Sequence, residues 1–153
     1  MTPEQLQLVQ SSFAELGDAA PAMAVDFYRR LFAADPSAEA LFTAGPDVMS
    51  VKFAAELDAI VEAISSFDTF APRVRELATR HVGYGVQTRH YQAVGEALLG
   101  ALAAHLAPDW DDALEAAWRR AYNLVAEVMM AAAARALTPA AAERRTGQGE
   151  STG

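Results

Sequence analysis

The residue with the clearest capacity for chemistry is a histidine that precedes two closely spaced glycines. His81 shares an apolar helical face with Leu77 and Ala78, and Gly83 and Gly85 follow it. A neutral imidazole nitrogen is a common metal ligand, and its other ring N–H then needs a hydrogen-bond acceptor. The ordinary alternative is a surface or core histidine that binds no metal. The apolar face and the glycine break favour a metal ligand at His81.

The composition excludes several other classes of site. The chain has 153 residues, no cysteine and a formal net charge of -8. Without cysteine, disulfides, thiolate nucleophiles and iron–sulfur clusters are excluded. The negative charge disfavours nucleic acid as a partner. We expect no membrane partner, because no apolar run is long enough to span a bilayer. The N-terminus lacks the pattern of a secretory signal, which favours a cytoplasmic protein.

The elements that must position His81 are expected to be helices. Alanine is abundant, and apolar residues recur at helical spacing with no competing strand pattern. We predict about seven helices, two of them short, in one all-α domain. They cover residues 2–17, 18–34, 35–42, 47–65, 74–81, 91–106 and 109–137, with a connector over 67–72. We predict a domain over 1–137 and a disordered tail over 138–153, which is rich in polar residues and glycine.

Several motifs recur at characteristic spacings along the chain. They are Phe27–Phe32 (FYRRLF), Leu41–Phe42, Arg80–His81, His90–Leu99 (HYQAVGEALL) and Ala117–Tyr122 (AWRRAY). Each motif is weak alone, but their order and spacing together resemble bacterial single-domain globins, and most closely the haem domain of flavohaemoglobins. The resemblance runs from about Thr2 to Leu137. It implies a globin fold whose helices sandwich haem b, which is iron protoporphyrin IX.

The resemblance makes His81 the proximal ligand of the haem iron. The carbonyl of Leu77, one helical turn upstream, is the expected acceptor for its other ring N–H. Tyr91 matches a family tyrosine near this histidine, and Val94 follows it on the same helix. Flavohaemoglobins add a glutamate from the last helix, but this chain has Ala133 at that position. The electron push that favours O–O cleavage should therefore be weaker, which argues against a peroxidase-like role.

On the opposite, distal side, the resemblance assigns Tyr28 as the hydrogen-bond donor to bound O₂. Such a bond contributes about 0.5–1.5 kcal/mol net, enough to slow O₂ release by about tenfold. Phe42 is the aromatic ring that the family places flat against the porphyrin. The ordinary alternatives are a buried tyrosine bonded to the backbone and a phenylalanine that only packs in the core.

The expected distal helix departs from the family pattern. Met49 stands where relatives carry glutamine or histidine, and Phe53, one turn later, is expected to face the iron. Three consequences are open for this apolar roof. In order of preference, it keeps the pocket dry, it narrows ligand access, or the Met49 sulfur binds the iron.

The chain contains four other basic side chains that bear on a haem site. Lys52 and Arg80 are candidates for contact with a haem propionate, although a solvated side chain is the default for both, and Lys52 is also a candidate iron ligand. His90 and His105 lack the context of His81. We expect both histidines to be ordinary surface or helix-face residues.

Three functions fit these residues. The preferred one is a binding protein that carries or stores O₂ and binds other diatomic gases such as NO and CO. The second is a nitric oxide dioxygenase, in which bound O₂ attacks NO to give nitrate. That enzyme would need a separate reductase, because the chain has no flavin or nicotinamide fingerprint. The third is a gas sensor or a haem-free globin-fold interaction module, and the lack of an output domain counts against a sensor.

Overall fold

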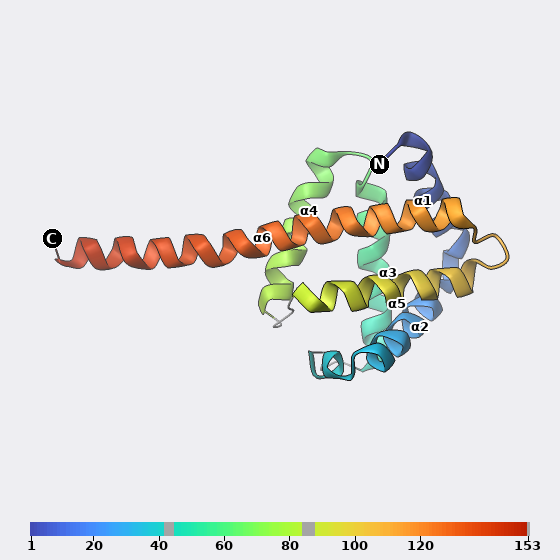
Figure 1. Cartoon of the computed structure of the whole chain (residues 1–153), viewed down its shortest axis with the longest axis horizontal. Helices are drawn as coiled ribbons and strands as arrows, with labels where there is room; N and C mark the ends of the chain where they lie inside the picture. Colours follow the sequence, from blue (N-terminus) through green and yellow to red (C-terminus); the bar gives the residue numbers. More distant parts are fainter. Residues whose placement is uncertain (42–44, 84–87, 153) are drawn as a thin grey trace.

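The computed structural model describes the backbone of residues 1–41, 45–83 and 88–152. It describes the side chains over the same ranges, except at residues 41, 46, 67, 81–83, 88 and 136–152. Over these ranges the chain forms six α-helices, two 3₁₀ segments and no strand, so the all-α prediction is confirmed (Figure 1). In chain order they are α1 (Pro3–Leu16), η1 (Gly17–Ala19), α2 (Ala20–Ala34), η2 (Pro36–Leu41), α3 (Pro46–Ala63), α4 (Phe67–Gly83), α5 (Thr88–Leu106) and α6 (Asp112–Thr152).

The first helix begins at a capping box. The Thr2 hydroxyl accepts a hydrogen bond from the Gln5 N–H at 3.1 Å, and the Gln5 side chain accepts one from the Thr2 N–H at 3.1 Å. These two bonds satisfy N–H groups that a helix start leaves without partners. Gly17, at φ 49°, then ends α1 in a conformation that suits glycine. Helix α2 begins at Ala20 and has no side-chain cap.

Two element boundaries differ from the expected ones. Residues 67–72, predicted as a connector, form the start of α4 with Pro72 inside the helix. Phe70 and Ala71 are 1% and 2% exposed, so their burial offsets the backbone hydrogen bond that Pro72 cannot make. Helix α6 continues past its expected end through Pro139 to Thr152. The alanines at 131–134 and 140–142, on both sides of Pro139, favour helix there. The separation of 138–153 from the domain remains a prediction.

The helices pack around two neighbouring groups of buried side chains. The larger group joins α1, α2, α3, α5 and the start of α6, and the smaller joins the end of α3 and the first two-thirds of α4 to the middle of α6. Helix α2 packs on α5 and α3, while α6 packs on α1 and α4. Figure 1 shows α5 and α6 running side by side and α6 projecting beyond the body.

A buried hydrogen-bonded chain joins the first helix to the last. The Trp118 indole N–H donates to the Ser12 hydroxyl at 2.9 Å, and that hydroxyl donates to the Val9 carbonyl at 3.1 Å. Trp118 and Ser12 are 2% and 4% exposed, so an unpaired polar atom here would be costly. The chain of bonds therefore fixes α1 against α6.

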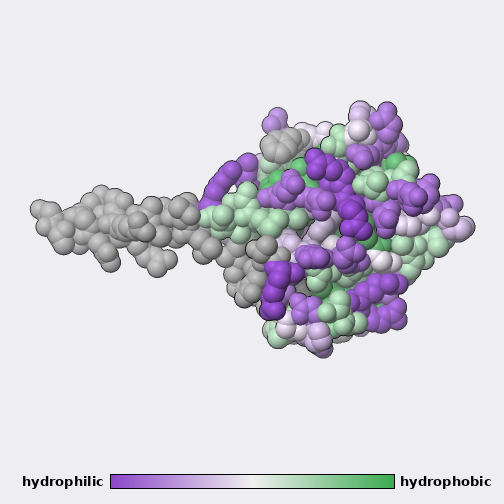
Figure 2. Space-filling model, viewed as in Figure 1, coloured by the Kyte–Doolittle hydropathy of each residue, from purple (hydrophilic) through white to green (hydrophobic). Residues whose placement is uncertain are grey.

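The surface of the body is mainly hydrophilic on the face that Figure 2 shows, with small hydrophobic groups between the polar ones. Among the described residues, no helix is both long enough and apolar enough to cross a membrane. The cytoplasmic location remains a prediction from the sequence.

Candidate functional site

A cavity of about 190 Å³ lies between α2 and α3 on one side and α4, α5 and α6 on the other. Voids in protein interiors rarely exceed the size of a water molecule, so a space of this volume indicates a binding site. Its walls are mostly aliphatic and aromatic. The predicted site residues that line it are Tyr28, Phe53, Leu77, Tyr91 and Val94.

The wall formed by α2 and α3 is built from stacked aromatic rings. The Phe27 and Phe53 rings stack with centroids 4.4 Å apart and planes 13° apart, and the edge of Phe53 meets Tyr28 at 5.7 Å. Phe32 stacks on the other side of Tyr28 at 5.8 Å. Each such pair contributes about 0.5–1.5 kcal/mol beyond its burial. The rings therefore hold the Tyr28 phenol in one orientation.

Burial also sets the protonation state of this phenol. Tyr28 is 9% exposed, and desolvation raises its pKa to about 12. The hydroxyl therefore keeps its proton through the physiological pH range, as a hydrogen-bond donor must.

The wall formed by α5 and α6 is held by a hydrogen bond and a close contact. The Tyr122 hydroxyl donates to the Tyr91 carbonyl. The ring of Tyr122 lies so close to α5 that a Cβ on Gly95 would be 2.6 Å from its Cε1 atom. Burial raises the pKa of Tyr122, with Tyr91 adding to the shift, and burial also raises the pKa of Tyr91. Both phenols are therefore neutral. The close contact with the Tyr122 ring also means that the packing requires glycine at position 95.

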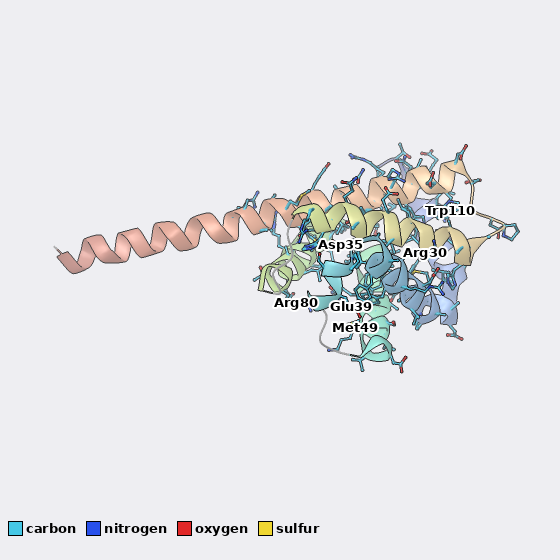
Figure 3. All side chains as sticks on the ribbon, turned by 60° about the horizontal axis from the view of Figure 1, so that its bottom comes forward. Arg30, Asp35, Glu39, Met49, Arg80 and Trp110 are labelled. Carbon is cyan, nitrogen blue, oxygen red and sulfur yellow. The ribbon has the colours of Figure 1, made fainter. Side chains whose placement is uncertain are left out.

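The remaining predicted residues lie in different places. Met49, labelled in Figure 3, is 8% exposed in the larger buried group and does not line the cavity, so Phe53 is the roof residue that reaches it. Lys52 and Arg80 are exposed. Phe42 lies outside the described residues. His81 belongs to α4, but its side chain also lies outside them.

Two polar residues of the cavity wall were not predicted. His90 is 4% exposed and lines the cavity, with its Nε2 atom 3.9 Å from an Asp35 carboxylate oxygen. Of the two positions expected for it, surface or helix face, the surface position is wrong. His90 precedes Val94 by four residues and shares its helical stripe, a signal that the sequence offered. Glu56 lines the cavity three residues after Phe53 for the same reason. His105 is exposed, as expected for a surface or helix-face residue.

Most of the helical body matches a known protein family. The globin family model matches residues 25–129, most of the helical body. The chain belongs to the globin family. Globins are haem proteins, and an apolar cavity flanked by aromatic rings suits a flat, largely apolar tetrapyrrole.

Bacterial proteins provide the most informative relatives of this globin. It is 31% identical over 134 residues to a flavohaemoprotein of Vibrio cholerae, which covers 85% of this chain and 34% of that protein. A flavohaemoprotein of Bordetella parapertussis is 31% identical over 150 residues, covering 96% of this chain and 37% of its own length. This globin therefore spans about a third of the length of these relatives.

Two solved structures share its fold. A bacterial globin from Campylobacter jejuni superposes with a TM-score of 0.79 at 23% identity, covering 90% of this chain and 99% of that one. An engineered carbene transferase, made from a candidate nitric oxide dioxygenase of Rhodothermus marinus, superposes with a TM-score of 0.83 at 29% identity, covering 92% and 99%. The prediction of a globin fold is thus confirmed.

Proposed function

We propose that this globin holds haem b in its cavity and binds O₂ reversibly there. The observation that carries the proposal is the protonated phenol of Tyr28 on the wall of an apolar cavity. His81, on α4, would hold the iron, with the Leu77 carbonyl as acceptor for its second ring nitrogen. Phe42, Tyr91 and Val94 would pack against the macrocycle. When bound, ferrous haem supplies an iron position at which O₂, CO and NO bind.

The residues on the two sides of the haem would then have different roles. Tyr28 donates a hydrogen bond to the gas molecule, while the Phe27 and Phe53 rings keep water away from it. On the opposite side, Ala133 stands where flavohaemoglobins carry a glutamate, so we expect a neutral proximal imidazole. A hydrogen-bond donor for the gas combined with a weak electron push supports reversible binding rather than O–O cleavage.

The test is the rate constant of O₂ dissociation after Tyr28→Phe substitution. Loss of the hydrogen bond should raise this rate constant about tenfold, since about 1.4 kcal/mol corresponds to a factor of ten. Tyr122→Phe is the matched control. Its hydroxyl is occupied by the Tyr91 carbonyl, so the rate constant should change by less than about twofold.

An unchanged rate constant in the Tyr28→Phe variant would refute the role of Tyr28. Failure of the purified globin to show a haem absorption band after supply of haem would refute the proposal as a whole.

A second candidate function is nitric oxide dioxygenase, favoured by the similarity to the Rhodothermus marinus protein and to flavohaemoproteins. In this reaction NO, O₂ and one electron give nitrate, and the electron must come from a separate reductase. The discriminating measurement is nitrate formed per haem in the presence of NADH and a bacterial flavin reductase. Many nitrates per haem would support the enzyme, whereas one nitrate per haem would leave a binding protein.

A further inference from the structure

Glu56 is an unusual member of the cavity wall, because it brings a carboxylate to a surface that is otherwise mainly aliphatic and aromatic. Its Oε1 atom accepts a hydrogen bond from an Arg80 guanidinium nitrogen at 3.3 Å. Glu56 is on α3 and Arg80 is on α4, so this ion pair joins two different walls of the cavity. Figure 3 shows Arg80 near the end of α4.

The position of this pair is at the edge of the cavity. The Glu56 side chain is 28% exposed and that of Arg80 is 50% exposed, so the pair lies where the cavity meets solvent. Helix α3 lines the cavity from Phe53 to Val61, whereas α4 contributes Leu77 among its described side chains. The ion pair therefore bridges the two helices one turn beyond the lining residue of α4.

We propose that the Glu56–Arg80 ion pair is a strap across the open edge of the cavity that slows the loss of haem. The inference rests on the proposed function, because it presumes that haem occupies the cavity. A flat ligand held between α3 and α4 can leave only if these helices separate at an edge. An ion pair between them must break first, which lowers the rate of escape.

The strap differs from the contact that the sequence suggested for Arg80. A haem propionate would compete with Glu56 for the same guanidinium. If Arg80 served only as a propionate anchor, removal of Glu56 would leave Arg80 available to the propionate and haem loss would be slower or unchanged. If the pair is a strap, removal of either partner makes haem loss faster. The two arrangements therefore predict opposite effects for Glu56→Gln.

The experiment measures the rate constant of haem transfer from the ferric globin to an excess of a haem-free scavenger globin. Glu56→Gln and Arg80→Gln should each raise this rate constant about three- to fivefold, the range for a partly exposed ion pair. The double variant should be no faster than either single variant, because both remove one interaction. High salt should bring the unsubstituted globin toward the variants.

The chain offers a matched control pair. Arg119 on α6 and Glu96 on α5 form an interhelical ion pair at 2.9 Å with exposed side chains, and neither residue lines the cavity. Arg119→Gln should leave the rate of haem transfer unchanged. Charge reversal of the strap by Glu56→Arg with Arg80→Glu should restore slow transfer, which separates the ion pair from general effects on the fold.

The outcomes distinguish the inference from the proposed function. Slower or unchanged haem transfer in Glu56→Gln, with faster transfer in Arg80→Gln, would overturn the strap and identify Arg80 as a propionate anchor. Equal acceleration by Arg119→Gln would also overturn it. Failure of the unsubstituted globin to take up haem would instead overturn the proposed function.

Discussion

The two walls of the cavity are stabilised in different ways. On the α2–α3 wall, the rings of Phe27, Phe53 and Tyr28 contact one another, and their packing orients the phenol. On the α5–α6 wall, Tyr122 is fixed by a hydrogen bond to the Tyr91 main chain and by the absence of a side chain at Gly95. The first wall depends on side-chain volume, and the second depends on how closely two helices approach.

Because of this difference, the two walls should respond differently to substitutions. Removal of a ring from the α2–α3 wall leaves a void next to a cavity that is already open. Addition of a single methyl group to the α5–α6 wall forces the helices apart. We therefore expect the first wall to be sensitive to truncation and the second to enlargement.

The largest effect is expected for Phe27→Ala. Phe27 is 2% exposed and contacts both Phe53 and Tyr28. Truncation should lower the free energy of unfolding by about 3–5 kcal/mol, measured by urea denaturation of the haem-free protein. Phe27→Leu, which keeps most of the side-chain volume, should lower the free energy of unfolding by less than half of this amount. An equal loss for both would show that ring volume does not support this wall.

A smaller effect with a clear sign is expected for Gly95→Ala. The new Cβ would meet the Tyr122 ring at 2.6 Å, so overpacking should outweigh the gain in helix propensity and lower the free energy of unfolding by about 1–2 kcal/mol. Gly100→Ala, in the same helix, is the control. Its nearest neighbour is the flexible Arg30 guanidinium at 3.1 Å, and that substitution should be neutral or stabilise by up to about 1 kcal/mol. Equal changes in the free energy of unfolding for Gly95→Ala and Gly100→Ala would contradict the close approach of α6 to α5.

The smallest expected effect is that of pH on the rate constant of O₂ dissociation. Burial raises the pKa of Tyr28 to about 12, and a raised pKa means that the phenol keeps its proton, so donation is unaffected below that value. The rate constant of O₂ dissociation should therefore stay constant between about pH 6 and 10. Stopped-flow measurement across this range checks the expectation. A step in the rate constant within this range would contradict the Tyr28 phenol as the donor that governs O₂ release.

Much of the fold followed from local patterns in the sequence. The helices predicted over 2–17 and 35–42 depend on patterns among neighbouring residues, and the structure has α1 and η2 at these places. The start of α4 could not be found in this way. Pro72 argues against a helix locally, and it was the burial of Phe70 and Ala71 against other helices that decided the outcome.

The candidate site was predictable where a residue type carried its own signal. Tyr28 and Tyr91 were identified from motifs and Phe53 from its position on the expected distal helix, and all three line the cavity. His90 and Glu56 were missed because a polar residue on a helix is exposed by default. Only the approach of α3 to α4, and of His90 to Asp35, reveals that these two side chains are enclosed partly or fully.

The distribution of the lining residues along the chain has a consequence for biosynthesis. The cavity takes Val9 from the first helix and Met129 from the last, and the Ser12–Trp118 bond joins those same helices. A chain emerging from the ribosome cannot complete its pocket until nearly the whole body has been translated. The complete pocket therefore forms only after most of α6 has left the ribosome.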